Sequence, residues 1–264
     1  MNQVSIGPSR FCVAGSSLGG GLGIKSCLSN QGRPLSGSTR FYPLGTIEQL
    51  PPIIPIFPLP NLVMFPGVRV PLHIFELRYR EMVAEVGPAE GVIGMMLLKG
   101  DWERDYCDYP DIFAVGCAGR IGNLVRMPDG RFNLVLEGLA EFRIAHELRD
   151  RSFRRAKVDW CPVKPQALDL DDEAMRSLRA MLVSYIGDSA VETWRVAVEE
   201  GGLRGSDLVN FLCFHLDLTV LEKQTLLEAL NSRARCLLDV LSFRLEERKL
   251  GPGGSDGGGS GIVQ

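Results

Sequence analysis

Proline recurs every few residues in the apolar stretch PIIPIFPLPNLVMFPGVRVPL (52–72). A proline has no backbone N–H, so a sheet tolerates it only on an edge strand, at a strand start or at a bulge. Near the end of the stretch, Val68, Val70 and Leu72 alternate with Arg69 and Pro71. We therefore predict short, kinked strands of a small closed barrel, with residues 52–60 as a strand at its edge.

The next hundred residues continue this strand-rich pattern, with one helical interruption. After His73 the apolar residues fall at helical spacing, and Gly87 followed by Pro88 predicts the end of that helix. The sequence PDG (128–130) predicts the turn of a hairpin. Other apolar or alternating runs predict strands at 91–99, 112–127, 131–138, 140–148 and 154–160. Residues 53–164 are thus expected to hold about six strands and one helix.

From residue 168 to residue 250 the apolar spacing is helical. Ser206 is in position to cap a helix over 207–216. Thr219 and Glu222 have the spacing of a capping box, and we expect them to open a helix that runs towards Lys249, which at about 28 residues would extend about 40 Å. The expected fold class is therefore α+β: a small barrel over 53–164 followed by a helical bundle over 168–250.

The two ends of the chain differ in composition from this body. Residues 1–50 are rich in Gly and Ser and carry no acid before Glu48. We predict a disordered extension there, with organelle targeting by residues 1–40 or a misassigned start as alternatives. Residues 251–264 have the composition of a flexible Gly-rich tail. Residues 48–250 hold 25 basic and 31 acidic residues, which argues against a general nucleic-acid binder.

Seven cysteines are scattered along the chain without a C-x-x-C pair. Their number and spacing fit neither a zinc site nor a disulfide framework, so reduced thiols are the simplest interpretation. The sequence has no apolar run of the ~18–20 residues that span a bilayer. We therefore expect a cytoplasmic protein that carries no cofactor and no metal.

Four segments resemble the N-terminal domain of Lon proteases, also called the Lon substrate-binding domain, in its stand-alone bacterial form. They are PIFPLPNLVMFPGVRVPLHIFELRYREM (55–82), VGCAGRI (115–121), MPDGRFNLVLEGLAEFRI (127–144) and EKQTLLEAL (222–230). The resemblance covers about residues 53–249 and implies a barrel related to the PUA barrel, followed by helices. Full Lon proteases add an ATPase module and a Ser–Lys peptidase module. This sequence has no Walker A loop, so we expect a non-enzymatic protein.

The resemblance implies recognition of unfolded or degradation-bound polypeptides, as an adaptor or regulator of proteolysis. Short strands with free edges, and a groove beside a helix, suit capture of an extended peptide. Core packing is the alternative for Phe65, Phe75 and Tyr79. For His73 the alternatives are a general base or ligand, and a hydrogen bond that orders the turn. The candidate peptide-binding residues are Phe65, His73, Phe75, Arg78, Tyr79, Trp102 and Tyr106.

The sequence also fits other functions. A PUA-like barrel that binds RNA or a small-molecule ligand as a regulator is one alternative. A hydrolase is another, but the sequence shows no nucleophile beside His73. The expected partners are polypeptide substrates or a protease, and no membrane. A basic patch for RNA would draw on Arg78, Arg80, Arg120, Arg126 and Arg131.

Overall fold

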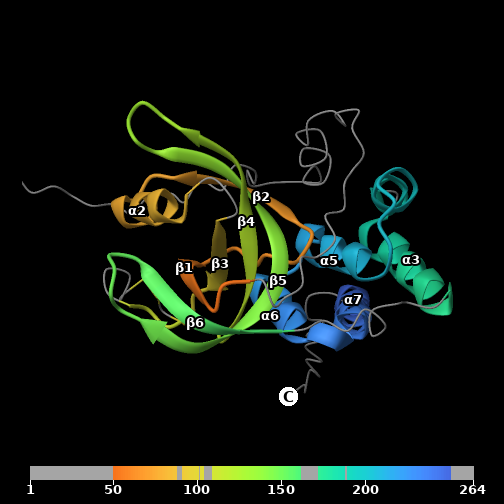
Figure 1. The fold of residues 1–264 in the computed structure, drawn as a ribbon. Coiled ribbons are helices and arrows are strands. Elements are labelled where there is room, and N and C mark those ends of the chain that lie inside the picture. Colours follow the sequence, from red (N-terminus) through yellow and green to blue (C-terminus); the bar gives the residue numbers. More distant parts are fainter. Residues whose placement is uncertain are drawn as a thin grey trace, which may run out of the picture.

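The computed structural model of the chain describes residues 50–87, 91–100, 102–103, 109–161, 172–187 and 189–250. A strand-rich part with one helix lies beside a group of helices formed by the later residues (Figure 1). The first part contains β1 (Ile53–Leu59), β2 (Arg69–Ile74), α2 (Leu77–Val86), β3 (Val92–Leu97), β4 (Val115–Arg126), β5 (Phe132–Leu148) and β6 (Arg154–Trp160). The second contains α3 (Asp172–Ile186), α4 (Ser189–Trp194), a π-helical turn (Arg195–Glu200), α5 (Gly205–His215), α6 (Val220–Glu228), a 3₁₀ turn (Leu230–Ser232) and α7 (Arg233–Leu250).

The six strands are hydrogen-bonded in the order β2-β5-β4-β3-β1-β6, and β6 also pairs with β5. Five of them therefore form a closed circuit, which is the connectivity of a small barrel. Strand β5 makes the closure possible, because it is 17 residues long and pairs with β4 over Phe132–Arg143 on one side. It also pairs with β2 near its start and with β6 near its end. Register shifts in its pairings with β4 and β6 mark the irregularities that let it bend. The predicted α+β class is confirmed, whereas the PUA relationship stays a prediction.

Strand β1 corrects the prediction that residues 52–60 form an edge strand, because it lies between β3 and β6. It pairs with β6 over Ile53–Ile56 and with β3 over Ile56–Leu59. Pro55 falls in the first half and Pro58 in the second, so each proline has a strand partner on one side only. The strand changes partner at its midpoint, and this change accommodates two prolines away from the edge.

The hydrogen bonds at the two ends of β1 show which way the prolines face. Pro52 O accepts from Val158 N at 2.9 Å, so antiparallel alternation directs the nitrogen of Pro55 away from β6. Leu59 O accepts at 3.1 Å from the amide that directly follows β3, so alternation directs the nitrogen of Pro58 away from β3. Each proline nitrogen thus points to the side of β1 on which no strand is paired beside that residue.

Strand β2 is the edge strand among the described residues, and it pairs with β5 alone. Gly138 N donates to Val68 O at 2.8 Å, so alternation directs the backbone groups of Arg69, Pro71 and His73 away from β5. The missing N–H of Pro71 therefore faces the free edge. The edge strand of the described sheet is thus β2, in the second proline-containing segment, and not residues 52–60.

The described residues form two buried apolar clusters, and the larger one runs from the sheet into the helices. Phe65 lies in the same buried cluster as Leu208, Leu226 and Leu237. The loop that carries Phe65 approaches β5 so closely that a Cβ at Gly138 would lie 2.2 Å from Phe65 O. The two parts therefore share their packing and are not separate domains joined by a linker.

A buried ion pair joins the sheet to the helices. Arg233, at the start of α7, is 1% exposed and donates to Glu141 Oε1 of β5 at 2.5 Å. It also donates to Asn210 Oδ1 of α5 and, at 2.8 Å, to the carbonyl of Leu226 in α6. Its guanidinium lies 5.3 Å from the ring centroid of Phe65. One side chain thus connects β5 with three helices.

The predicted single helix from Thr219 to Lys249 is wrong, because it breaks after Glu228 and the chain reverses. Leu230, in the 3₁₀ turn, has a φ of 43°. Helix α7 then runs back along α6, where Arg244 donates to both carboxylate oxygens of Glu222 at 2.8 and 2.7 Å. Folding back lets both helices bury an apolar face, which a projecting 40 Å helix would leave in water.

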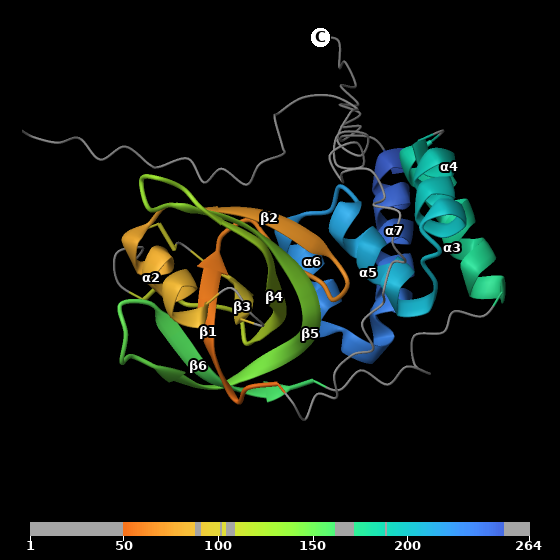
Figure 2. The same cartoon turned by 45° about the horizontal axis from the view of Figure 1, so that its top comes forward.

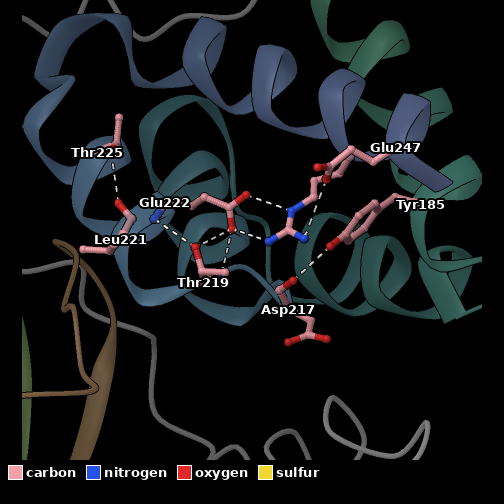
Figure 3. A network of polar contacts seen from close by, with 8 residues as sticks. Tyr185, Asp217, Thr219, Leu221, Glu222, Thr225 and Glu247 are labelled. Carbon is pink, nitrogen blue, oxygen red and sulfur yellow. Dashed lines mark hydrogen bonds and ion pairs between the residues drawn. The ribbon is translucent and has the colours of Figure 1, made fainter. Parts of the chain in front are cut away.

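The capping box at the start of α6 is confirmed. Thr219 Oγ1 accepts from Glu222 N at 3.2 Å, and the Glu222 carboxylate accepts from Thr219 N at 2.6 Å (Figure 3). The bonds from Arg244, with those from Thr219, lower the pKa of Glu222 to about 2. Glu222 therefore serves two helices at once, as a cap for α6 and an ion-pair partner for α7.

Two other details differ from the sequence predictions. Helix α5 begins at Gly205 with Arg204 as its N-cap and no side-chain cap, so Ser206 lies inside the helix. His73 belongs to β2, and helix α2 begins only at Leu77. Among the described residues, no helix has both the length and the apolar character needed to cross a membrane.

Candidate functional site

Helix α2 covers the end of the strand circuit that lies away from the other helices (Figures 1 and 2). Its buried residues are Tyr79, Met82 and Val83, and the ring of Tyr79 lies 4.4 Å from that of Phe57 in β1. Burial raises the pKa of Tyr79 to about 12, against a smaller opposing effect of Arg78. The phenol of Tyr79 is thus part of the packing that holds α2 in place.

Two hairpin turns hold the flanks of α2. On one flank, the guanidinium of Arg80 packs on the β4–β5 turn, where a Cβ at Gly130 would lie 2.1 Å from Arg80 Nη2. On the other flank, Ser152 of the β5–β6 turn donates to Glu81, and Arg151 Nε lies 3.2 Å from a Glu85 carboxylate oxygen. The helix is therefore fixed in position relative to the β4–β5 turn, and so is its exposed face.

The β4–β5 turn is ordered by its own polar groups. Met127 N donates to Arg131 O at 2.8 Å, which closes the hairpin. Asp129 accepts from Arg131 N at 3.1 Å and from Arg131 Nε at 2.6 Å. These bonds from Arg131 lower the pKa of the Asp129 carboxyl below its usual value, and the nearby charge of Arg80 adds to the effect. The turn therefore presents Arg131 in a defined orientation.

His73 lies beside this turn and both of its ring nitrogens are engaged. Nδ1 lies 2.6 Å from Asn133 Oδ1, and Nε2 lies 3.4 Å from Arg131 Nη1. An amide oxygen only accepts and a guanidinium only donates, so these contacts fit a neutral ring with its proton on Nδ1. The geometry supports the ordering role for His73, because the contacts of its ring nitrogens within the described part of the chain are with Asn133 and Arg131 and not with a nucleophile.

Exposed apolar side chains occur on β4, which leads into this turn, and on α2, which packs against the turn through Arg80. Leu77, in the first turn of α2, is 70% exposed and Val125, near the end of β4, is 58% exposed. Phe75 is partly exposed, and its ring lies over His73 with 6.2 Å between the centroids. We call this region the hairpin surface; it consists of His73, Phe75, Leu77, Arg80, Val125 and Arg131.

The structure separates the predicted peptide-binding residues into two groups. Phe65 and Tyr79 are 0% and 4% exposed, which places them in the core, the alternative considered for them. His73, Phe75 and Arg78 lie at the surface next to α2, each partly exposed. Trp102 is partly exposed as well, and Tyr106 lies outside the described residues.

Leu77 and Val125 were missed, although the sequence carries a signal for each. Leu77 is out of phase with the buried face of α2, which holds Tyr79, Met82 and Val83. Val125 is an apolar residue just before the polar PDG turn, on the exposed face of the hairpin next to Asn133. An apolar residue out of phase with the core of its own element is the feature to search for.

The five arginines considered for an RNA-binding patch do not share one surface. Arg80 and Arg131 meet at the β4–β5 turn, whereas Arg78 pairs with Glu76 at 3.0 Å. Arg126 lies on the opposite face of the hairpin from Val125, over the ring of Phe132. The last of them, Arg120, lies further along β4 opposite Glu137. The cationic groups near the turn are thus few and are mixed with apolar side chains.

Solved structures of known proteins define the class of this fold. The fold is that of Lon N-terminal domains: the Lon N-terminal domain protein from Xanthomonas campestris is 23% identical with a TM-score of 0.54, over 72% of this chain and 98% of that one. The N-terminal domain of the Mycobacterium avium complex Lon protease is 20% identical with the same TM-score, over the same shares. Both likenesses cover nearly the whole of the solved domain.

The family model of the ATP-dependent protease La (LON) substrate-binding domain matches residues 53–241, and the chain belongs to this family. Lon protease 2 of Myxococcus xanthus is 28% identical over 80% of this chain and 26% of its own length. The Lon protease of Anaeromyxobacter dehalogenans is 26% identical over 77% of this chain and 24% of its own length. The chain thus spans about a quarter of the length of these relatives.

Proposed function

We propose that the chain binds unfolded or degradation-bound polypeptides, and that the hairpin surface is where it does so. The observation that carries this proposal is the match of residues 53–241 to a substrate-binding domain. The location is supported by the exposed Leu77 of α2 and the exposed Val125 of β4, because large apolar side chains exposed on fixed elements can mark a binding site. Unfolded chains expose the apolar groups that such a surface can cover.

The arrangement of α2 supports the same location. A surface binds more tightly when it does not have to be ordered on binding. Contacts at both flanks of α2 already fix Leu77 relative to the β4–β5 turn. The free edge of β2 next to this surface is a less favourable docking strand, because Pro71 removes one donor and Arg69 places a charge there.

The test compares an unfolded and a folded form of one protein. Fluorescein-labelled α-lactalbumin, either carboxymethylated and unfolded or native, is titrated with the full chain and followed by anisotropy. We expect selective binding of the unfolded form. Leu77→Ser is expected to weaken it about tenfold, because burying a leucine side chain contributes about 1.5–3 kcal/mol.

The matched control is Leu221→Ser, which makes the same chemical change at a 64% exposed leucine of α6. It is expected to leave the affinity unchanged. Equal binding of both lactalbumin forms would contradict recognition of unfolded polypeptides. An equal loss in both variants would contradict the hairpin surface as the site.

We propose further that the chain contributes recognition rather than catalysis, as an adaptor that delivers polypeptides to a protease or as a regulator of one. The support is that the family match is to the substrate-binding domain. Incubating the chain with unfolded lactalbumin and Mg-ATP is expected to give no fragments on a gel. Fragments that accumulate with time would contradict this part of the proposal.

A further inference from the structure

Leu77 and Arg80 stand three residues apart on α2, and so lie next to each other on its surface. Arg80 in turn lies against the β4–β5 turn that carries Arg131. We propose that the hairpin surface selects polypeptide segments in which an acidic side chain stands close to a large apolar one. This inference rests on the proposed function and adds the class of segment that is bound.

The balance of charge around the β4–β5 turn is positive. Among the described residues, Arg80 has no carboxylate at ion-pair distance, and Arg126 contacts the ring of Phe132 instead of an acid. Asp129 is the acid of the turn, and it is already bound by Arg131 at 2.5 Å. The body of the chain is acidic, with 25 basic and 31 acidic residues over 48–250, so a cationic site beside exposed apolar groups is a local departure from the whole.

The acids of α2 do not neutralise this site. Glu76 is bound by Arg78, whose Nε and Nη2 each lie 3.0 Å from Glu76 Oε2. Glu81 accepts from Ser152, and Glu85 lies 3.2 Å from Arg151, both on the flank of α2 that faces the other turn. The helix thus directs Glu81 and Glu85 towards the β5–β6 turn and Arg80 towards the β4–β5 turn.

The geometry also indicates the spacing of the two recognised side chains. Residues at i and i+3 of a helix have Cβ atoms about 5–6 Å apart. In an extended segment, side chains on one face are two residues apart, or about 6.5–7 Å. An acid two residues from a leucine would therefore place its carboxylate near Arg80 while the leucine covers Leu77. The planar guanidinium of Arg80 suits a carboxylate, to which it can donate two parallel bonds.

A nucleic-acid ligand fits the same surface less well. Single-stranded RNA binds by stacking its bases on exposed aromatic rings along a basic groove. The exposed apolar groups here are the aliphatic Leu77 and Val125, and the ring of Phe75 is only partly exposed and lies over His73. The chemistry on the surface therefore favours a polypeptide over an RNA.

The experiment uses four fluorescein-labelled 12-residue peptides of Gly and Ser that differ at two positions. They contain Glu-Ser-Leu, Gln-Ser-Leu, Lys-Ser-Leu or Glu-Ser-Ser, and each is titrated with the full chain. We expect the Glu-Ser-Leu peptide to bind about fivefold more tightly than the Gln-Ser-Leu peptide, the upper range for an exposed ion pair. The Lys-Ser-Leu and Glu-Ser-Ser peptides are expected to bind more weakly still.

Variants at Arg80 connect this preference to the surface. Arg80→Gln is expected to abolish the difference between the Glu and Gln peptides, and Arg80→Lys to keep most of it. Arg80→Glu is expected to reverse the order of the Glu and Lys peptides. The matched control, Arg235→Gln, removes an exposed arginine of α7 and is expected to preserve the wild-type preference.

The outcomes separate this inference from the proposed function. Equal binding of the Glu and Gln peptides, with Leu77→Ser still weakening both, would overturn the charge preference and leave polypeptide binding in place. If the wild-type chain binds neither the peptides nor unfolded lactalbumin, the proposed function itself is overturned. Displacement of the peptide by a 12-nucleotide RNA in an Arg80-dependent way would overturn the inference in favour of a phosphate ligand.

Discussion

The two ends of the strand circuit are both covered by helices, but by different chemistry. At one end, α2 is held by the apolar Tyr79, Met82 and Val83 and by polar contacts at the protein surface. At the other, Arg233 and Glu141 form a fully buried ion pair (1% and 0% side-chain exposure) that draws α5, α6 and α7 onto β5. The surface contacts are screened by water and are each weak, whereas the buried pair requires both partners.

This contrast shows how one small fold can combine a firm junction with an accessible surface. A buried charge that loses its partner is strongly destabilising, so we expect the helical end to open only with global unfolding. The α2 end depends on a few apolar side chains and on exposed pairs, and it carries the apolar residues that face solvent. Substitutions at the two ends should therefore change the free energy of unfolding by different amounts, and three measurements test this.

The largest effect is expected for Arg233→Ala. Glu141 would be left buried without its partner, and the free energy of unfolding should fall by about 3–5 kcal/mol. Urea denaturation followed by circular dichroism measures it, with Arg235→Ala, an exposed arginine of the same helix, as the control. The double variant Arg233→Met with Glu141→Leu should recover much of the loss. A loss below 1 kcal/mol in Arg233→Ala would remove the distinction between the two ends.

An intermediate effect is expected for Glu222, which links α6 and α7. Its pKa is lowered from 4.5 to about 2 in the folded state, so its contribution is complete above pH 4.5 and is lost as the pH falls through about 2. We expect Glu222→Gln to lower the free energy of unfolding by about 1–2 kcal/mol at pH 7, because the group is partly exposed and screened. Urea midpoints of the variant and the wild type, measured between pH 7 and pH 2, should converge at the acid end. A constant difference across that range would show that packing, not charge, is responsible.

The smallest effect is expected at the α2 end. Arg151 and Glu85 are both about half exposed, at 50% and 46%, so Arg151→Gln should change the free energy of unfolding by less than about 0.5 kcal/mol. Hydrogen exchange is the more sensitive measurement, because the amides of α2 should exchange faster while those of α7 do not change. Faster exchange in both helices would mean that the two ends unfold as one unit.

The sequence predicted the elements whose signals are local. The PDG turn, the alternation that gives β6 over Arg154–Trp160, and the capping box of Thr219 and Glu222 are all found in the structure. Each depends on residues within a few positions of one another, so one sequence is enough to recognise it. The change from strand spacing to helical spacing near residue 168 predicted that the strand-rich part precedes the helices, and the structure confirms this order.

The features that the sequence did not predict depend on contacts between distant residues. Two prolines fit into an interior strand only because β1 changes partner at Ile56. The helix after Thr219 breaks because an unbroken helix would leave its apolar face in water. The stripe of leucines did not predict the break, because it is the same for one long helix and for two helices that fold back on each other. For the candidate site, helical spacing already sets Leu77 out of phase with the core of α2, but the packing of Arg80 on the β4–β5 turn depends on a contact between distant residues.

The closure of the strand circuit has a consequence for how the chain folds during synthesis. β1 acquires its antiparallel neighbour only when β6, which pairs Ile53 with Lys157, has been made. Until then half of β1 has an open side on the growing chain, with apolar residues such as Ile54 and Ile56 that are 1% and 0% exposed in the finished fold. Pairings between residues so far apart form slowly, because the intervening chain must first be ordered. Before β6 leaves the ribosome, the nascent chain itself displays the kind of apolar segment that the finished protein is proposed to bind.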